Sequence, residues 1–276
     1  MPAQNKTAPV TIAESTLTVE NRVATLTFER YDVRNALTGT ALCDDILATV
    51  NWANANREVS VLIITGAGKA FSSGGDVKAL RSKAGMFAGT PTEIEAEYRS
   101  GIQRMPVAMH SAEVITIAAV NGPAIGAGCD LACMCDLRLG SEAAAFGETF
   151  VNLGIIPGDG GAWFLQRLIG YQRAADMTFR GRIVRAPEAR EMGLLLEVVE
   201  PAMLMSRAQE LAAEIAAKPP QALRYAKRLM KLAQRTELPD FLDYCAALQS
   251  FCHGTDDHAE AIAAFLDKRE PNYTGR

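Results

Sequence analysis

The most informative stretch of the sequence is Val114-Ile-Thr-Ile-Ala-Ala-Val120, followed by Asn121-Gly-Pro-Ala-Ile-Gly-Ala-Gly128. The first part is an apolar run that predicts a buried strand, and the glycines of the second part predict a tight turn into a helix. Backbone N–H groups at the start of a helix have no acceptor within it, so such a turn aims free amides at one point. We interpret the stretch from Val114 to Gly161 as an active site.

A second glycine-rich loop, Thr65-Gly-Ala-Gly-Lys-Ala-Phe-Ser-Ser-Gly-Gly-Asp76, follows a short apolar strand predicted at Val61–Ile64. The two loops could each give one amide to a single carbonyl oxygen, and such a donor typically contributes about 10² to 10³ in rate. Both could equally be ordinary turns from a strand into a helix. Neither loop has the spacing of a P-loop or of a dinucleotide-binding turn, which disfavours a nucleotide-dependent dehydrogenase.

The order of the remaining elements indicates an α/β protein. Alternating apolar and polar residues in Leu17–Val19 and Val23–Phe28 predict a hairpin, and amphipathic helices alternate with short strands after it. Beyond about residue 200 the pattern is almost wholly helical. We therefore expect three parts: a flexible tail over 1–14, a core with the site over 15–200, and a helical region over 201–276.

Composition excludes several classes of protein. Of the 276 residues 49% are hydrophobic and 22% are charged, which indicates a well-filled core. The net charge of −4 argues against a nucleic-acid partner. There is no apolar run long enough for a membrane span and no apolar signal-peptide core near the N-terminus, so no membrane partner is expected. The six cysteines lack zinc-site spacing, and we expect a cytoplasmic protein with reduced thiols and no metal.

Several motifs in a fixed order carry a resemblance to a known family. They are Lys69-Ala-Phe-Ser-Ser-Gly-Gly-Asp-Val77, Ala118-Ala-Val-Asn-Gly-Pro-Ala-Ile-Gly-Ala-Gly-Cys-Asp-Leu131, Cys135-Asp-Leu-Arg138, Leu153-Gly-Ile-Ile-Pro-Gly158 and the C-terminal segment Asp256–Arg269. From about Leu17 to Tyr273 the chain resembles the crotonase superfamily, also called the enoyl-CoA hydratase/isomerase family. Ordered motifs over most of a chain are far more specific than one glycine loop.

The resemblance implies a crotonase-like spiral of ββα repeats with a C-terminal helical trimerisation region, assembled as a homotrimer or homohexamer. It implies an acyl-CoA thioester as substrate, with coenzyme A as part of that substrate and no other cofactor. By position, the amides of Ser73 and Ala127 would hold the enolate oxygen. The residues that match coenzyme A-binding positions are Arg34, Ala36, Ala70, Gly74, Gly75, Asp76, Phe265 and Lys268, of which the last two often act from a neighbouring subunit. Simple helix packing is the alternative for Phe265.

The chain departs from the family pattern at the acid–base residues. Hydratases of the family hold a water molecule between two glutamates. Asp130 stands at the first of these positions and Phe150 at the second. A phenylalanine cannot move a proton, so the two-glutamate pattern of hydration is not retained.

Three carboxylates remain as candidates for the acid–base role. Asp130 could instead be a helix cap or a supporting hydrogen-bond partner, Glu148 an ordinary loop charge, and Asp159 the N-cap of the next helix. A lone base favours isomerisation of an enoyl-CoA double bond, while the family favours hydration. Thioester hydrolysis, decarboxylation, ring chemistry and a non-catalytic acyl-CoA-binding homologue are the alternatives.

Overall fold

The chain, seen in a computed structural model that describes residues 6–7 and 10–276, is built around a seven-stranded sheet. The strand order is β1-β2-β3-β4-β5-β7-β10, antiparallel from β1 to β3 and parallel from β3 to β10. The strands are β1 Lys6–Thr7, β2 Ser15–Glu20, β3 Val23–Phe28, β4 Val61–Gly66, β5 Ile115–Val120, β7 Leu137–Ser141 and β10 Glu197–Val199.

The predicted hairpin is confirmed. Strands β2 and β3 are joined by Asn21 and Arg22, which both have positive φ, at 48° and 68°. Two such residues form the kind of turn whose twist matches the twist of the paired strands. Within the predicted N-terminal tail, residues 1–5 and 8–9 lie outside the described residues, and Lys6–Thr7 pair with β2 as strand β1.

The parallel strands are buried on both faces. Along β4, Leu62 and Ile64 point to one apolar cluster, and Val61 and Ile63 point to a second cluster on the opposite face. Helices α1, α4 and α5 belong to the first cluster, and α9 covers the second. Alternation of side chains between two covered faces explains why these strands read as continuous apolar runs.

A second, three-stranded sheet lies beside the turn that opened the sequence analysis. Its strands are β6 Pro123–Ile125, β8 Ala145–Gly147 and β9 Ile183–Arg185, in the order β6-β8-β9. Strand β6 is parallel to β8, and β8 is antiparallel to β9. This small sheet positions two parts of the candidate site. Strand β6 leads into α5, which carries Asp130, and Glu148 follows β8 directly.

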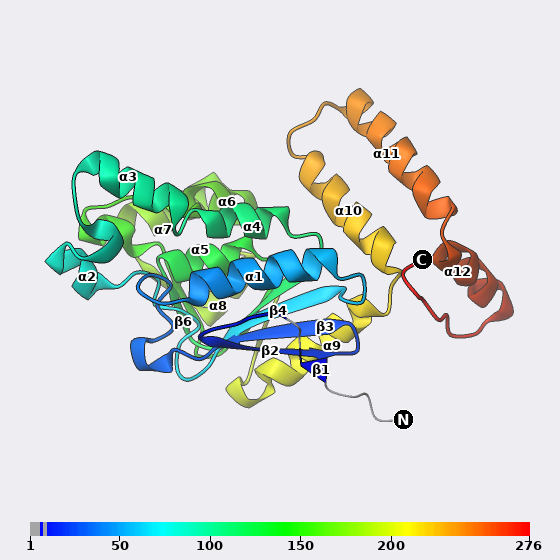
Figure 1. Cartoon of the computed structure of the whole chain (residues 1–276), viewed down its shortest axis with the longest axis horizontal. Coiled ribbons are helices and arrows are strands. Elements are labelled where there is room, and N and C mark those ends of the chain that lie inside the picture. The colour runs from blue at the N-terminus through cyan, green and yellow to red at the C-terminus, as the bar shows by residue number, and fades with distance from the viewer. Residues whose placement is uncertain (1–5, 8–9) are drawn as a thin grey trace.

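The helices fall into two groups (Figure 1). Those packed around the sheets are α1 Leu42–Ala55, α2 Val77–Ser82, α3 Pro91–Ser100, α4 Arg104–Ser111, α5 Ala127–Met134, α6 Gly161–Ile169, α7 Tyr171–Arg180, α8 Ala186–Glu191 and α9 Leu204–Ala216. The others, α10 Pro220–Leu232, α11 Leu238–His253 and α12 Asp256–Asp267, extend away from the sheet. Short 3-10 helices lie at η1 Tyr31–Val33, η2 Gly85–Phe87, η3 Thr149–Leu153 and η4 Pro201–Met203.

Among the described residues, no helix has the length and apolar character needed to cross a membrane.

The first of the projecting helices is fastened to the core by buried cations. The Arg224 guanidinium donates to the carbonyl oxygens of Ala53, Asn54, Asn56 and Val59 at 2.9–3.2 Å. These carbonyls belong to the last turn of α1 and to the segment that follows it. The carbonyls at the end of a helix lack partners within the helix, and the guanidinium supplies hydrogen bonds to them. The helical region that leaves the core therefore begins at α10, since α9 packs on the sheet.

Candidate active site

The two glycine loops predicted to face one ligand lie in direct contact. A Cβ atom added to Gly74 would lie 2.4 Å from the carbonyl oxygen of Ile125 and 2.9 Å from the amide nitrogen of Ala127. One added to Gly128 would lie 2.4 Å from the carbonyl oxygen of Ser72. The Ile125 amide also donates to that Ser72 oxygen at 3.0 Å. Only glycine fits both positions, because backbone approaches backbone there.

Ala127 and Gly75 each have a free amide at this contact. Ala127 is the first residue of α5, so its N–H has no acceptor within the helix. The Ser73 N–H donates to the Arg34 carbonyl at 2.9 Å and is already occupied, which corrects its predicted role as an oxyanion donor. The Gly75 N–H makes no hydrogen bond to any residue in the described part of the chain. Gly75, predicted only as a coenzyme A contact, is the better donor.

Three adjoining pockets form a path to these amides. The first, of about 610 Å³, is lined by Tyr31, Arg34 and Ala70 among others, and the second, of about 580 Å³, shares Arg34 and Ser73 with it. The third, of about 30 Å³, shares Gly75 and Thr38 with the second. Pockets that adjoin in this way suit an elongated ligand.

The predicted coenzyme A positions fall into two groups. Arg34 and Ala70 line the first pocket, Ala36, Gly75 and Asp76 line the second, and Gly74 is buried between the loops. The Asp76 carboxylate also caps α2 by accepting from the amides of Lys78 and Ala79.

Phe265 and Lys268, the other two predicted coenzyme A contacts, line none of the three adjoining pockets. Both lie at the end of α12, and α12 and α2 lie at opposite ends of the molecule (Figure 1). The Phe265 side chain is 81% exposed, so packing against its own chain does not explain it.

Two of the candidate carboxylates form a buried pair. Asp130 on α5 and Glu148 after β8 are both fully buried, and a Cβ added to Gly161 would lie 2.1 Å from an Asp130 oxygen and 2.7 Å from a Glu148 oxygen. None of the four carboxylate oxygens has a hydrogen-bond partner within the described ranges. Full burial excludes the reading of Glu148 as an ordinary loop charge. The α5 N-cap is Gly126 and no side chain caps it, which excludes Asp130 as a cap.

Burial sets the protonation of this pair. It raises the pKa of Asp130 well above its ordinary value, and the nearby Glu148 charge adds to this effect. Burial also raises the pKa of Glu148 to about 7. Two carboxylates that face each other away from water cannot both be ionised cheaply, so the pair holds a shared proton near neutral pH.

Asp159 occupies a different position, in the turn before α6. It is 6% exposed and lines the small pocket together with Gly75, whereas Asp130 and Glu148 do not. Burial raises the pKa of Asp159 to about 6. The N-cap of α6 is Gly160 and receives no side-chain cap, so the capping role expected for Asp159 is absent. One Asp159 carboxylate oxygen is buried without a partner among the described residues.

Neighbouring groups hold the turn that carries Asp159. The Gln103 side-chain amide donates to the Gly158 carbonyl at 3.0 Å, and the Tyr98 ring lies beside Gly158. Tyr98 also lines the small pocket. Neither residue was identified from the sequence, because no spacing rule links α3 and α4 to a turn so far along the chain.

Phe150 fills the place where a second glutamate was sought. It is 9% exposed, and its ring lies 3.5 Å from a Cβ added to Gly126, against the turn that presents the Ala127 amide. Phe150 lines the small pocket with Phe87, Ile102 and Ile155, so the wall beside the candidate base is apolar.

Two glycine loops that meet beside a pocket with a buried carboxylate are the arrangement expected of an enzyme active site. The sequence profile of the enoyl-CoA hydratase/isomerase family matches residues 18–276, and the chain belongs to that family. The predicted superfamily and fold class are thereby confirmed.

Individual relatives cover almost the whole chain. The 2,3-dehydroadipyl-CoA hydratase of Escherichia coli is 33% identical over 96% of this chain and 100% of its own length. The crotonyl-CoA hydratase of Syntrophomonas wolfei is 33% identical over 93% of this chain and 96% of its own. The crystal structure of an enoyl-CoA hydratase from Bacillus anthracis superimposes with a TM-score of 0.85 at 32% identity, covering 98% of this chain and 100% of that one.

The contact between the loops can be tested with two glycines. Gly74→Ala places a Cβ against backbone at φ +77° and should separate the two amides, so we expect kcat/KM on an enoyl-CoA ester to fall by about 10² to 10³. Gly170→Ala is the matched control, because Gly170 has a similar φ of +79° and a Cβ added there would meet nothing within 4 Å. Wild-type kcat/KM in a folded Gly74→Ala variant, checked by circular dichroism, would contradict this reading.

The buried pair predicts how stability depends on pH. Because the pKa of Glu148 rises to about 7 on folding from an ordinary value of 4.5, the folded chain keeps a proton that the unfolded chain releases between these values. The free energy of unfolding should therefore fall as pH rises through this window. Glu148→Gln should flatten that fall in urea titrations, while Glu142→Gln, on the exposed surface, should follow the wild type. If the free energy of unfolding of Glu148→Gln depends on pH as steeply as that of the wild type, the shared proton of Asp130 and Glu148 is ruled out.

Proposed function

We propose that this enzyme shifts the double bond of an enoyl-CoA thioester, with Asp159 as its single acid–base group. The amides of Gly75 and Ala127 hold the thioester oxygen. The observation that carries the proposal is the small pocket, in which Asp159 lies with Gly75 while Phe150 takes the place of a second acidic residue.

The proposed step needs one base and one oxyanion site. The ionised Asp159 carboxylate removes a proton from the carbon chain, and the electron pair moves through the conjugated system to the thioester oxygen. The two amides stabilise this enolate oxygen. Protonated Asp159 then returns its proton at the other end of the system, which restores the thioester carbonyl with the double bond moved. A pKa of about 6 suits this cycle, because the group is ionised at neutral pH and still basic.

Apolar walls support a transfer without water. Phe87, Phe150 and Ile155 line the pocket around Asp159. A water molecule there would compete both for the proton and for the enolate, and these side chains offer it no hydrogen bond.

Hydration is the second candidate, favoured by the buried pair and by the relatives. Asp130 and Glu148 lie close together, and their oxygens have no hydrogen-bond partner among the described residues. The pair therefore supplies two carboxylates, although Phe150 replaces the second glutamate of the hydratase pattern. The Escherichia coli and Syntrophomonas wolfei relatives are both named hydratases. In this reaction the pair would hold the water.

A panel of enoyl-CoA esters distinguishes the two reactions. We expect products of unchanged mass with a moved double bond, a kcat/KM that rises with pH to a plateau above about 6, and a loss of about 10² to 10⁴ in Asp159→Asn. Mass spectrometry and NMR identify the product, and Glu142→Gln serves as the charge control.

The outcomes that contradict isomerisation are equally specific. A product heavier by one water, lost in Asp130→Asn and kept in Asp159→Asn, establishes hydration. A free acid or CO₂ as product indicates another reaction of the family. Binding of the esters without turnover indicates a non-catalytic homologue.

We further propose a cytoplasmic homotrimer or homohexamer that associates through the C-terminal helices. Large apolar side chains are exposed on α11 and α12, namely Leu238, Leu242, Phe251, Ile262, Phe265 and Leu266. Exposed apolar groups gathered on one part of a surface are typical of an interface. In such an assembly Phe265 and Lys268 would reach the coenzyme A of a neighbouring subunit. Cytoplasm suits the six free cysteines.

Sedimentation measures this assembly directly. Phe251→Asp combined with Leu266→Asp places two charges in the proposed interface and should lower the sedimenting mass to that of one chain. Val107→Asp, a similarly exposed apolar position on α4, is the control and should leave the assembly intact. An unchanged mass in the double variant, or a wild-type monomer, would remove the interface from these helices.

A further inference from the structure

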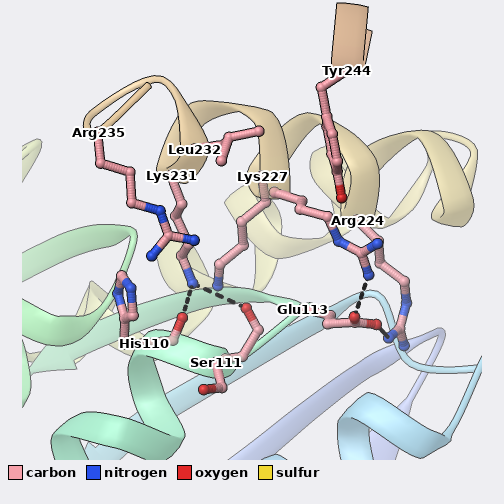
Figure 2. A pocket seen from close by; sticks show the side chains of 11 residues that line it. His110, Ser111, Glu113, Arg224, Lys227, Lys231, Leu232, Arg235 and Tyr244 are labelled. Carbon is pink, nitrogen blue, oxygen red and sulfur yellow. Dashed lines mark hydrogen bonds and ion pairs between the residues drawn. The ribbon is translucent and has the colours of Figure 1, made fainter. Parts of the chain in front are cut away.

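A second cleft lies away from the acyl-CoA path, between the end of α4 and helix α10. Its volume is about 410 Å³. Figure 2 shows basic side chains of α10 on one wall, facing His110, Ser111 and Glu113 on the other, with Tyr244 of α11 at one end. The cleft shares no lining residue with the three pockets of the acyl-CoA path.

Positive charge exceeds negative charge in this cleft. Five cations line it: Arg224, Lys227, Arg228, Lys231 and Arg235. Two carboxylates neutralise part of this charge. Glu113 pairs with Arg224 and Arg228, and Asp136 pairs with Lys227. The C-terminal ends of α4 and α10 add about one negative charge together. About two positive charges are left without a counter-charge.

Two of the cations are committed to the fold. Arg224 binds the carbonyls after α1, as described above. Lys227 is buried and donates to the Val114 carbonyl at 2.7 Å and to Asp136 at 2.6 Å. The hydrogen bonds of Arg224 and Lys227 fix α10 to the core. They do not account for the other three cations, which are Arg228, Lys231 and Arg235.

The remaining cations present donors to the open cleft. Lys231 donates to the carbonyls of His110 and Ala112 at 2.6 and 3.2 Å, which leaves its third N–H free. The Arg228 guanidinium donates to Glu113 at 2.6 Å and also lies beside the Tyr244 hydroxyl. The Arg235 guanidinium lines the cleft and makes no hydrogen bond to another described residue. Figure 2 shows Arg235 and Lys231 on the same side of the cleft. Arg228 and Lys231 lie on one face of α10, and Arg235 lies in the turn that follows this helix.

The pKa of two groups agrees with this excess. Burial and then the nearby Lys231 and Arg235 charges lower the pKa of His110. Burial and then Lys227 lower the pKa of Lys231 to about 8. An anion in the cleft would relieve the repulsion that both shifts reflect.

We propose that this cleft binds a dianionic phosphate group, either free phosphate or the end of a small organic phosphate. Two guanidinium forks and one ammonium group match the geometry and charge of a phosphate. Leu232 and Tyr244 leave an apolar wall for an attached organic part. A bound phosphate bridges α4 and α10 and so fixes the projecting helices to the core.

Calorimetry on the full-length protein tests the proposal at constant ionic strength, and the paired variants described below separate binding in this cleft from binding in the acyl-CoA path. The probes are inorganic phosphate and glycerol 3-phosphate. We expect saturable binding of at least one, accompanied by a rise in Tm. Binding of both identifies phosphate itself as the ligand chemistry, and binding of glycerol 3-phosphate alone identifies an organic phosphate.

Paired variants locate the binding. Arg228→Gln with Arg235→Gln should weaken Kd at least about tenfold, because it removes two charge-assisted donors. Arg185→Gln with Arg190→Gln removes the same charge from exposed positions on another face and should leave Kd unchanged. No binding of either probe, or an equal Kd in both double variants, overturns the proposal. Neither result depends on which reaction the enzyme catalyses.

Discussion

The close approach of two backbone segments, Ser72–Gly75 and Ile125–Gly128, is the constraint on which the rest of the structure depends. Each segment follows a parallel strand of the main sheet, and each puts a glycine where any side chain would strike the other backbone. The approach brings the Gly75 and Ala127 amides to one place. It also closes the inner end of the channel, so the pocket, the base and the apolar wall are all arranged around it.

The fold and the amide site were largely accessible from the sequence. Apolar runs between glycine loops predict buried parallel strands, and Asn21 and Arg22 sit where a tight hairpin turn requires positive φ. The exact donor was not accessible. Ser73 and Gly75 lie in the same loop, and only the folded structure shows that the Ser73 amide donates to the Arg34 carbonyl.

The carboxylates show where sequence reasoning ends. Glu148 was a candidate acid–base group with an ordinary loop charge as the alternative, since nothing in its neighbours reveals that the start of α6 closes over it. Asp159 was a candidate with a helix cap as the alternative, and the N-cap of α6 is Gly160 instead. In both cases the deciding quantity is burial, which depends on contacts between elements far apart in the chain.

The hydrogen bond from Gln103 to the Gly158 carbonyl has a consequence for the shape of the small pocket. Gln103 lies between α3, whose Tyr98 lines that pocket, and α4, and the turn that it holds carries Asp159. One wall of the pocket and the turn with the carboxylate are therefore joined by a direct contact. The width of the pocket and the position of Asp159 are set together rather than independently.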